Sequence, residues 1–295
     1  MRLGASLDTR SDDPARIARA YADAGYGAAP CPPASLDQPE HIRAIRESFA
    51  RYDVTLAEVG VWNNMLDPDP ARRAANLEAN VQALALADEV GALCCVNIAG
   101  SFHPTNWDGP HPRNLSEEAF ELTVQNVRHI LDAVKPRRAR YSLEPMPWVV
   151  PDSPDSYLRL IAAIDRPTFG VHLDPVNMIN CPSRYYDNAG FLRECFAKLG
   201  PWIVSCHGKD IRLREELTVH LDEVRPGLGV LDYRTFLQEL NRLPGDVPLM
   251  LEHLPQAGYP LAREYVVGVA AQSELSFTAP CTRIGRVDGC GDVAA

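Results

Sequence analysis

Short apolar runs alternate with longer amphipathic segments along most of the chain. The runs are typical of buried strands, whereas the longer segments have apolar residues at helical spacing. The pattern predicts eight strands, at residues 3–7, 26–29, 55–61, 93–99, 140–144, 169–174, 203–207 and 248–252. The helical pattern is clearest over 70–90 and 116–134.

Three helix starts carry a local signal. Asp13, Asp69 and Ser153 each stand directly before a proline. Proline suits the first helical turn because its missing N–H would have no partner there, and the preceding oxygen can accept a free backbone amide. We therefore expect helices to begin at residues 14, 70 and 154.

The alternation of strand and helix determines the predicted fold class. Parallel strands need helical crossovers, and eight such units close a (β/α)8 barrel. The rival, an open doubly wound sheet, usually has a glycine-rich turn after its first strand, and residues 8–13 here contain no glycine. The chain is thus predicted to be a single α/β TIM barrel over 1–272. A short irregular C-terminal tail over 273–295 lacks periodicity, and we expect it to be mobile.

Composition narrows the classes of function. Of 295 residues, 46% are hydrophobic, and the net charge of −10 argues against a nucleic-acid partner. No apolar stretch approaches the roughly 18 residues of a membrane span, and the charged start does not resemble a secretory signal. Eight cysteines without a CxxC pair are typical of a reduced compartment. We expect a cytoplasmic protein with no membrane partner.

Acidic and imidazole side chains stand at the ends of four consecutive predicted strands. They are Glu144, Asp174, His207 and Glu252. One such residue would be explained by neighbouring amides, but four in register should meet at the C-terminal rim of the barrel. Three carboxylates and an imidazole would repel each other without a cation between them. The sequence predicts one divalent metal ion, with Mn²⁺ or Mg²⁺ favoured by the oxygen ligands and Co²⁺ or Zn²⁺ still open.

Several motifs around these positions resemble a known family. They are SLEPMPW, GVHLDPVNM, IVSCHGKD, PGLGVLDY at Pro226–Tyr233, and PLMLEH. Together they resemble the sugar phosphate isomerase/epimerase family with the xylose isomerase-like barrel, which includes ketose 3-epimerases and hydroxypyruvate isomerases. The resemblance covers roughly residues 1–272. It implies Glu144, Asp174, His207 and Glu252 as ligands of one divalent ion, often Mn²⁺.

The resemblance also implies a reaction. Chelation of a sugar carbonyl and its neighbouring hydroxyl acidifies the C–H between them. A carboxylate removes that proton to give an enediolate, and a proton returned elsewhere yields the isomer or epimer. In the family this acid/base pair corresponds to Glu144 and Glu252. A small carbohydrate substrate and a possible homo-oligomer are implied as well.

Two positions depart from the ketose epimerase pattern. Asn177 replaces a histidine three residues after the strand-six aspartate, and Val150 replaces a glutamate. Asn177 can donate a hydrogen bond but cannot carry a proton as imidazole does. The same carbanion could instead expel a β-substituent, so a lyase acting on an oxidised (3-keto) sugar or glycoside remains the alternative.

Loop residues supply further candidates for the site. We expect His103, Asn177, Lys209, Trp107 and Trp148 to contact substrate, although a tryptophan in such a loop can simply cover the barrel mouth. His172 should point to the same side of its strand as Asp174, either orienting a metal ligand or packing in the barrel interior. His253 is expected to point away from Glu252, into the helix layer.

Two other classes of function compete with this hypothesis. A nuclease like the DNA-repair relatives of the family would need more histidines than the eight present and a basic groove. A non-catalytic sugar-binding barrel would have little reason to carry all four predicted ligands.

Overall fold

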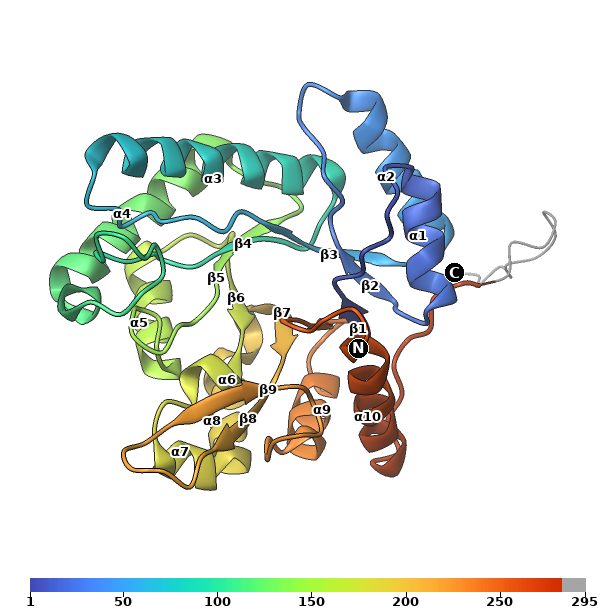
Figure 1. Ribbon diagram of the computed structural model, residues 1–295. Coiled ribbons are helices and arrows are strands. Elements are labelled where there is room, and N and C mark those ends of the chain that lie inside the picture. The colour runs from blue at the N-terminus through green and yellow to red at the C-terminus, as the bar shows by residue number, and fades with distance from the viewer. Residues whose placement is uncertain (283–295) are drawn as a thin grey trace.

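A computed structural model describes residues 1–282 and shows a closed parallel barrel, as predicted (Figure 1). Each predicted barrel strand is present, with ends within two residues of those expected. The barrel strands are β1 (Arg2–Ala5), β2 (Ala28–Pro30), β3 (Thr55–Gly60), β4 (Cys94–Asn97), β5 (Arg140–Leu143), β6 (Phe169–Leu173), β7 (Ile203–Gly208) and β10 (Pro248–Leu251). Because all of them are parallel, their carboxyl ends meet at one rim.

Helices surround the barrel on the outside (Figure 1). They are α1 (Pro14–Asp23), α2 (Pro39–Arg51), α3 (Pro70–Val90), α4 (Glu117–Val134), α5 (Pro154–Ile164), α6 (Pro175–Met178), α7 (Pro182–Tyr186), α8 (Asn188–Leu199), α9 (Tyr233–Asn241) and α10 (Gly258–Gln272). The three predicted helix starts are confirmed. Asp13, Asp69 and Ser153 each accept a hydrogen bond from a backbone amide in the first turn of α1, α3 and α5.

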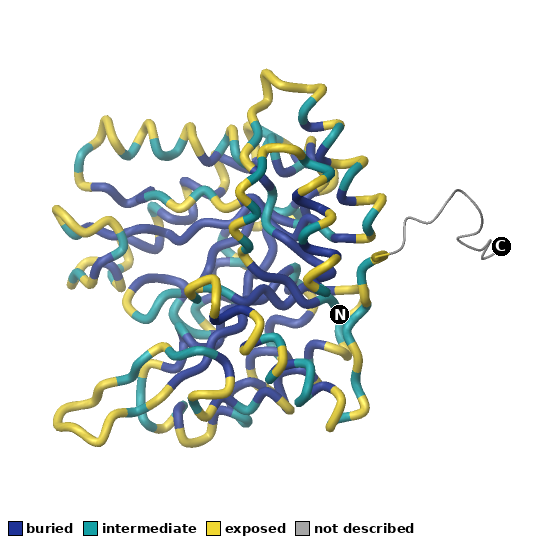
Figure 2. The backbone as a smooth tube through the Cα atoms, turned by 45° about the vertical axis from the view of Figure 1, so that its right-hand side comes forward, coloured by how far each residue is buried: buried dark blue, intermediate teal, exposed yellow. Residues whose placement is uncertain are grey.

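The core lies between the strands and the inner faces of the helices. Figure 2 shows a buried interior, while exposed residues gather on the outside of the molecule. The barrel strands are buried except at some of their ends. Tyr141, Tyr157 and Phe169 are among the largest fully buried side chains. The Tyr157 hydroxyl donates to the carbonyl of Leu143, at 2.6 Å, and thereby ties α5 to the end of β5. Among the described residues, no helix has both the length and the apolar character needed to cross a membrane.

One element was not predicted. An antiparallel hairpin, β8 (Asp210–Leu213) and β9 (Leu221–Val224), follows β7 and extends from the barrel (Figure 1). Four of its eight strand residues are polar, and most of the eight are not fully buried. Residues 210–213 do alternate between polar and apolar, but this signal is only four residues long and was missed.

The chain beyond α10 first packs against the base of the barrel. The amide of Thr278 donates to the carbonyl of Met1, at 3.0 Å, and that of Cys281 donates to the carbonyl of Tyr52, at 2.8 Å. The remainder of the predicted tail, 283–295, lies outside the described residues.

Asp88 ties the end of α3 to the segment that leads into β5. Its Oδ1 accepts the backbone amides of Arg137, Arg138 and Ala139 at 2.5–2.9 Å. Burial opposes ionisation, but these hydrogen bonds hold the pKa of Asp88 below its usual range. Because the folded-state pKa lies below the unfolded value of about 3.9, the stabilisation is complete above that pH and is lost as pH falls through the folded-state pKa.

We expect Asp88→Ala to lower the free energy of unfolding by about 2 kcal/mol at pH 7, since three amides lose a charged acceptor. The difference from the parent should shrink below about pH 4 in urea unfolding curves. Asp88→Asn keeps an accepting oxygen and should lower the free energy of unfolding by less. Glu89→Gln, at the exposed next position, is the matched control. A cost for Asp88→Ala that is equal at pH 7 and pH 3 would contradict this assignment.

Candidate active site

The structure brings Glu144, Asp174, His207 and Glu252 together at the carboxyl ends of β5, β6, β7 and β10. One potential ligand atom from each lies within 4.8 Å of the others. Nδ1 of His207 is 2.8 Å from Oε1 of Glu144 and 3.0 Å from Oε1 of Glu252. Asp174 also caps α6, because its Oδ1 accepts the amide of Asn177 at 3.1 Å. Its second oxygen is thereby left facing the cluster.

Lys209 enters the same cluster two residues after His207. Its side chain is 1% exposed, and Nζ lies 2.8 Å from Asp174 Oδ2 and 2.5 Å from Glu252 Oε1. Glu144 Oε1 lies 3.5 Å away. The ammonium group therefore neutralises part of the carboxylate charge.

Burial and mutual charge shift the pKa values of the cluster in different directions. Burial raises the pKa of Glu144 to about 7. Although burial opposes it, the positive His207 and Lys209 lower the pKa of Glu252. Burial of His207 favours its neutral form, but the Glu252 and Glu144 carboxylates outweigh this and raise the pKa of His207. Two carboxylates whose pKa values are driven apart form the pattern of an acid/base pair.

The donor set suits a hard divalent cation. It contains three carboxylates and one imidazole, which are the ligands that Mn²⁺ and Mg²⁺ accept. Two of the oxygens, Asp174 Oδ2 and Glu252 Oε1, are buried and make no hydrogen bond within residues 1–282. Their contacts with Lys209 are ion pairs only. Three converging carboxylates carry more negative charge than one ammonium group neutralises, and this excess favours a bound cation.

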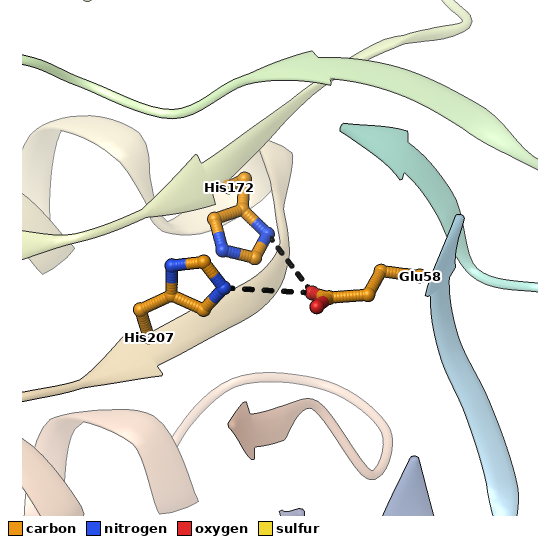
Figure 3. A group of neighbouring side chains, drawn as sticks. All are labelled: Glu58, His172 and His207. Atoms are coloured by element: carbon orange, nitrogen blue, oxygen red, sulfur yellow. Dashed lines mark ion pairs between the residues drawn. The ribbon is translucent and has the colours of Figure 1, made fainter. Parts of the chain in front are cut away.

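A second group of side chains meets the opposite nitrogen of His207. Glu58 on β3 and His172 on β6 converge with His207 in the barrel interior (Figure 3). Glu58 Oε2 lies 3.7 Å from His207 Nε2 and 3.8 Å from His172 Nδ1. Burial lowers the pKa of His172, with the nearby His207 adding to the effect. His172 thus contacts a residue of the predicted metal site and also packs in the barrel interior.

A cavity of about 660 Å³ opens above the cluster. Asn177 and Lys209 line it, together with Trp62, Trp107 and Trp148. The three indoles remain 38–43% exposed. Trp148 Nε1 donates to the carbonyl of Asp108, at 2.7 Å, which joins the loops after β5 and β4 across the cavity mouth.

Two histidines differ in their relation to the cavity. His103 is not among the residues that line the cavity, and its Nδ1 accepts the amides of Thr105 and Asn106 within its own loop. His253 was expected to face the helix layer, and this is wrong. Its backbone has φ +54°, the side chain lines the cavity, and Nδ1 lies 3.0 Å from Glu223 on β9. The left-handed backbone breaks the strand alternation on which that expectation rested.

Asp210 fixes the loop that follows the hairpin. Its Oδ1 accepts the amides of Ile211 and Leu231, and its Oδ2 accepts those of Gly227 and Gly229, all at 2.8–3.1 Å. A Cβ at Gly229 would lie 2.3 Å from Asp210 Oδ1, so the close approach requires glycine. This loop holds the chain just after Lys209.

Glu58 and Glu223 were missed from the sequence. Glu58 is the one charged residue in the apolar strand segment 54–61, and this lone charge was an available signal. Glu223 lies on the unpredicted hairpin, and no local pattern places it near Lys209, 3.6 Å away.

Comparison with known proteins identifies relatives of this architecture. A family profile described as a xylose isomerase-like TIM barrel matches residues 18–267. No curated protein matches the sequence significantly. At 13–16% identity, the three solved structures described below resemble this chain in fold.

A xylose isomerase-like TIM barrel protein from Mycobacterium smegmatis, in complex with magnesium, is 16% identical with a TM-score of 0.65. The alignment covers 92% of this chain and 97% of that one. 3-Keto-D-glucoside 4-epimerase from E. coli is 15% identical with a TM-score of 0.65, over 90% and 98% of the two chains. D-Psicose 3-epimerase with D-tagatose from Clostridium cellulolyticum H10 is 13% identical with a TM-score of 0.64, over 93% and 98%.

Proposed function

Because the chain belongs to the xylose isomerase-like TIM barrel family, we propose that it is a divalent-metal-dependent isomerase or epimerase of a sugar or sugar derivative. The observation that carries the proposal is the convergence of three carboxylates and one imidazole at the floor of a cavity. Structural neighbours that act on keto sugars support the same class of substrate. We propose Mn²⁺ as the first choice of cation.

The chemistry follows from the positions of the two glutamates. A divalent cation held by Glu144, Asp174, His207 and Glu252 would polarise a sugar carbonyl and acidify the adjacent C–H. Glu144 and Glu252 approach His207 Nδ1 from different strands, so each can face a different side of a sugar carbon. One carboxylate removes the proton and the other, protonated, returns one.

Lys209 and Asn177 have supporting roles in this proposal. Lys209 Nζ lies 3.4 Å from Asn177 Oδ1, and Asn177 Nδ2 donates to Glu144 Oε1 at 3.2 Å. The lysine places a positive charge where negative charge develops on a substrate oxygen. The asparagine orients Glu144 and leaves proton transfer to the glutamates.

A lyase acting on a 3-keto sugar or glycoside is the second candidate. Two observations favour it. Asn177 provides no imidazole to hold a free ketose, and the cavity of about 660 Å³ with three exposed indoles has room for a substituent beyond one sugar ring. The carbanion chemistry is shared, and only the fate of the intermediate differs.

One screen tests both candidates. Purified protein with added Mn²⁺ is incubated in D₂O with ketoses, aldoses and 3-keto-glycosides, and the products are followed by NMR. Deuterium in a recovered or isomerised sugar supports isomerisation, and release of the aglycone supports the lyase. Binding of these sugars with neither deuterium incorporation nor product formation would contradict both.

We expect the cation to stabilise the fold. At 100 times its dissociation constant, a ligand that binds only the folded state adds about 2.7 kcal/mol. Mn²⁺ added to chelator-treated protein should therefore raise the melting temperature by about 5 °C. Asp174→Ala should remove this gain, whereas the exposed Asp12→Ala serves as the control and should retain it. If Mn²⁺ raised the melting temperature of Asp174→Ala as much as that of the parent, the cation would have to bind elsewhere.

A further inference from the structure

The deep face of His207 has features of a binding site that the proposed reaction does not use. Glu58, His172 and the Nε2 edge of His207 point toward one another in the barrel interior (Figure 3). The two imidazole rings lie edge to face, with their centroids 4.0 Å apart. Both dashed contacts in Figure 3 end on the same oxygen, Glu58 Oε2, so the three groups converge on one point.

Two of the three residues have buried polar atoms that make no hydrogen bond within the described part of the chain. Glu58 is 8% exposed, His172 is 0% exposed and His207 is 1% exposed. Among the residues that the structure describes, Glu58 Oε2 and both ring nitrogens of His172 have no hydrogen-bond partner. Leaving such groups unpaired in a protein interior costs about 1–3 kcal/mol each, so this arrangement calls for a bound species.

The spacing fits a metal ion better than direct hydrogen bonds. The contacts of 3.7 and 3.8 Å are too long for hydrogen bonds, and the third nitrogen–nitrogen distance is below 4.8 Å. A point equidistant from the corners of such a triangle lies at most about 2.4 Å from each, within reach of zinc–nitrogen and zinc–oxygen bond lengths of about 2.0–2.2 Å. Two imidazoles and one glutamate are also the protein ligands of many zinc sites with an open fourth position. Glu58 and His207 line the cavity, so that position faces the route of entry.

We propose that Glu58, His172 and Nε2 of His207 form a second cation position, selective for a nitrogen-preferring metal such as Zn²⁺, which excludes the cation of the carboxylate cluster. The exclusion follows because a neutral imidazole has one lone pair and can ligate through only one ring nitrogen at a time. Hard ions take the oxygen-rich cluster on the Nδ1 side, and Zn²⁺ takes the nitrogen-rich position on the Nε2 side. The exclusion rests on the proposed function, whereas the zinc position does not.

Calorimetric titration of chelator-treated protein with Zn²⁺ alone and with Mn²⁺ alone tests the proposal. Glu58→Gln and His172→Phe should each weaken Zn²⁺ binding by about tenfold or more and change Mn²⁺ binding less than threefold. Asp174→Asn should instead weaken Mn²⁺ binding and leave Zn²⁺ binding nearly unchanged. Protein loaded with one Zn²⁺ should take up no Mn²⁺. Circular dichroism confirms that each variant is folded before titration.

His253→Ala controls for adventitious zinc at the exposed His253–Glu223 pair and should bind Zn²⁺ as the parent does. Unchanged Zn²⁺ affinity in folded Glu58→Gln and His172→Phe would overturn the proposal. Parallel losses of Zn²⁺ and Mn²⁺ affinity in Glu58→Gln would also overturn it, because Glu58 would then act only by orienting His207. Simultaneous binding of both ions would refute the exclusion. If Mn²⁺ fails to bind the parent while Zn²⁺ behaves as expected, the proposed function fails and the zinc position stands.

Discussion

Replacing Glu252 by glutamine is expected to reduce turnover about 10²–10⁴-fold, the usual contribution of a positioned acid or base. Glutamine keeps the size and one ligating oxygen but cannot accept a proton. The loss should appear equally in kcat for the sugar identified by the screen and in the rate of deuterium uptake from solvent. Glu144→Gln should behave in the same way, since glutamine at that position can likewise neither accept nor return a proton.

Loss of the cation must be separated from loss of the proton carrier. Saturating Mn²⁺ should restore part of the activity of Asp174→Asn, in which only a ligand is weakened, but little of that of Glu252→Gln. Glu223→Gln, on the cavity wall but outside the four-residue cluster, should retain activity within about tenfold. Full activity of Glu252→Gln at saturating Mn²⁺ would remove Glu252 from the acid/base pair.

Asp210→Asn is expected to lower the free energy of unfolding by about 2–4 kcal/mol. Each carboxylate oxygen of Asp210 accepts two backbone amides, so the amide group of asparagine would face two donors in either orientation. Two N–H groups would then lack acceptors, either the buried pair of Ile211 and Leu231 or the part-buried pair of Gly227 and Gly229. Partial burial places the cost at about 1–2 kcal/mol for each group. The change is measured by urea unfolding of the metal-loaded protein.

Gly229→Ala should lower the free energy of unfolding by a similar amount for a different reason, because the added Cβ would collide with Asp210 Oδ1. The exposed Asp12→Asn is the control, with an expected effect within about 0.5 kcal/mol. If Asp210→Asn were as stable as the control, the four hydrogen bonds would not hold the loop together. Because the loop follows Lys209 directly, both variants should also weaken substrate binding.

The amino-acid sequence alone determined the barrel and the four-residue cluster. Short apolar runs, proline-initiated helices and polar residues at strand ends are local signals. In a parallel barrel, the position of a residue along its strand is enough to predict whether it lies at the C-terminal rim. Glu144, Asp174, His207 and Glu252 could therefore be selected as a set before any distance between them was known.

Only the tertiary structure decided which other side chains meet this cluster. Glu58 reaches His207 because barrel closure brings β3 across from β6 and β7, a distance that no local pattern encodes. Glu223 and His253 meet because a polar hairpin folds back and one residue adopts a left-handed backbone. His103 satisfies amides of its own loop instead. Local periodicity specifies which face of a strand a residue occupies, whereas contacts between non-neighbouring strands and loops depend on closure of the whole barrel.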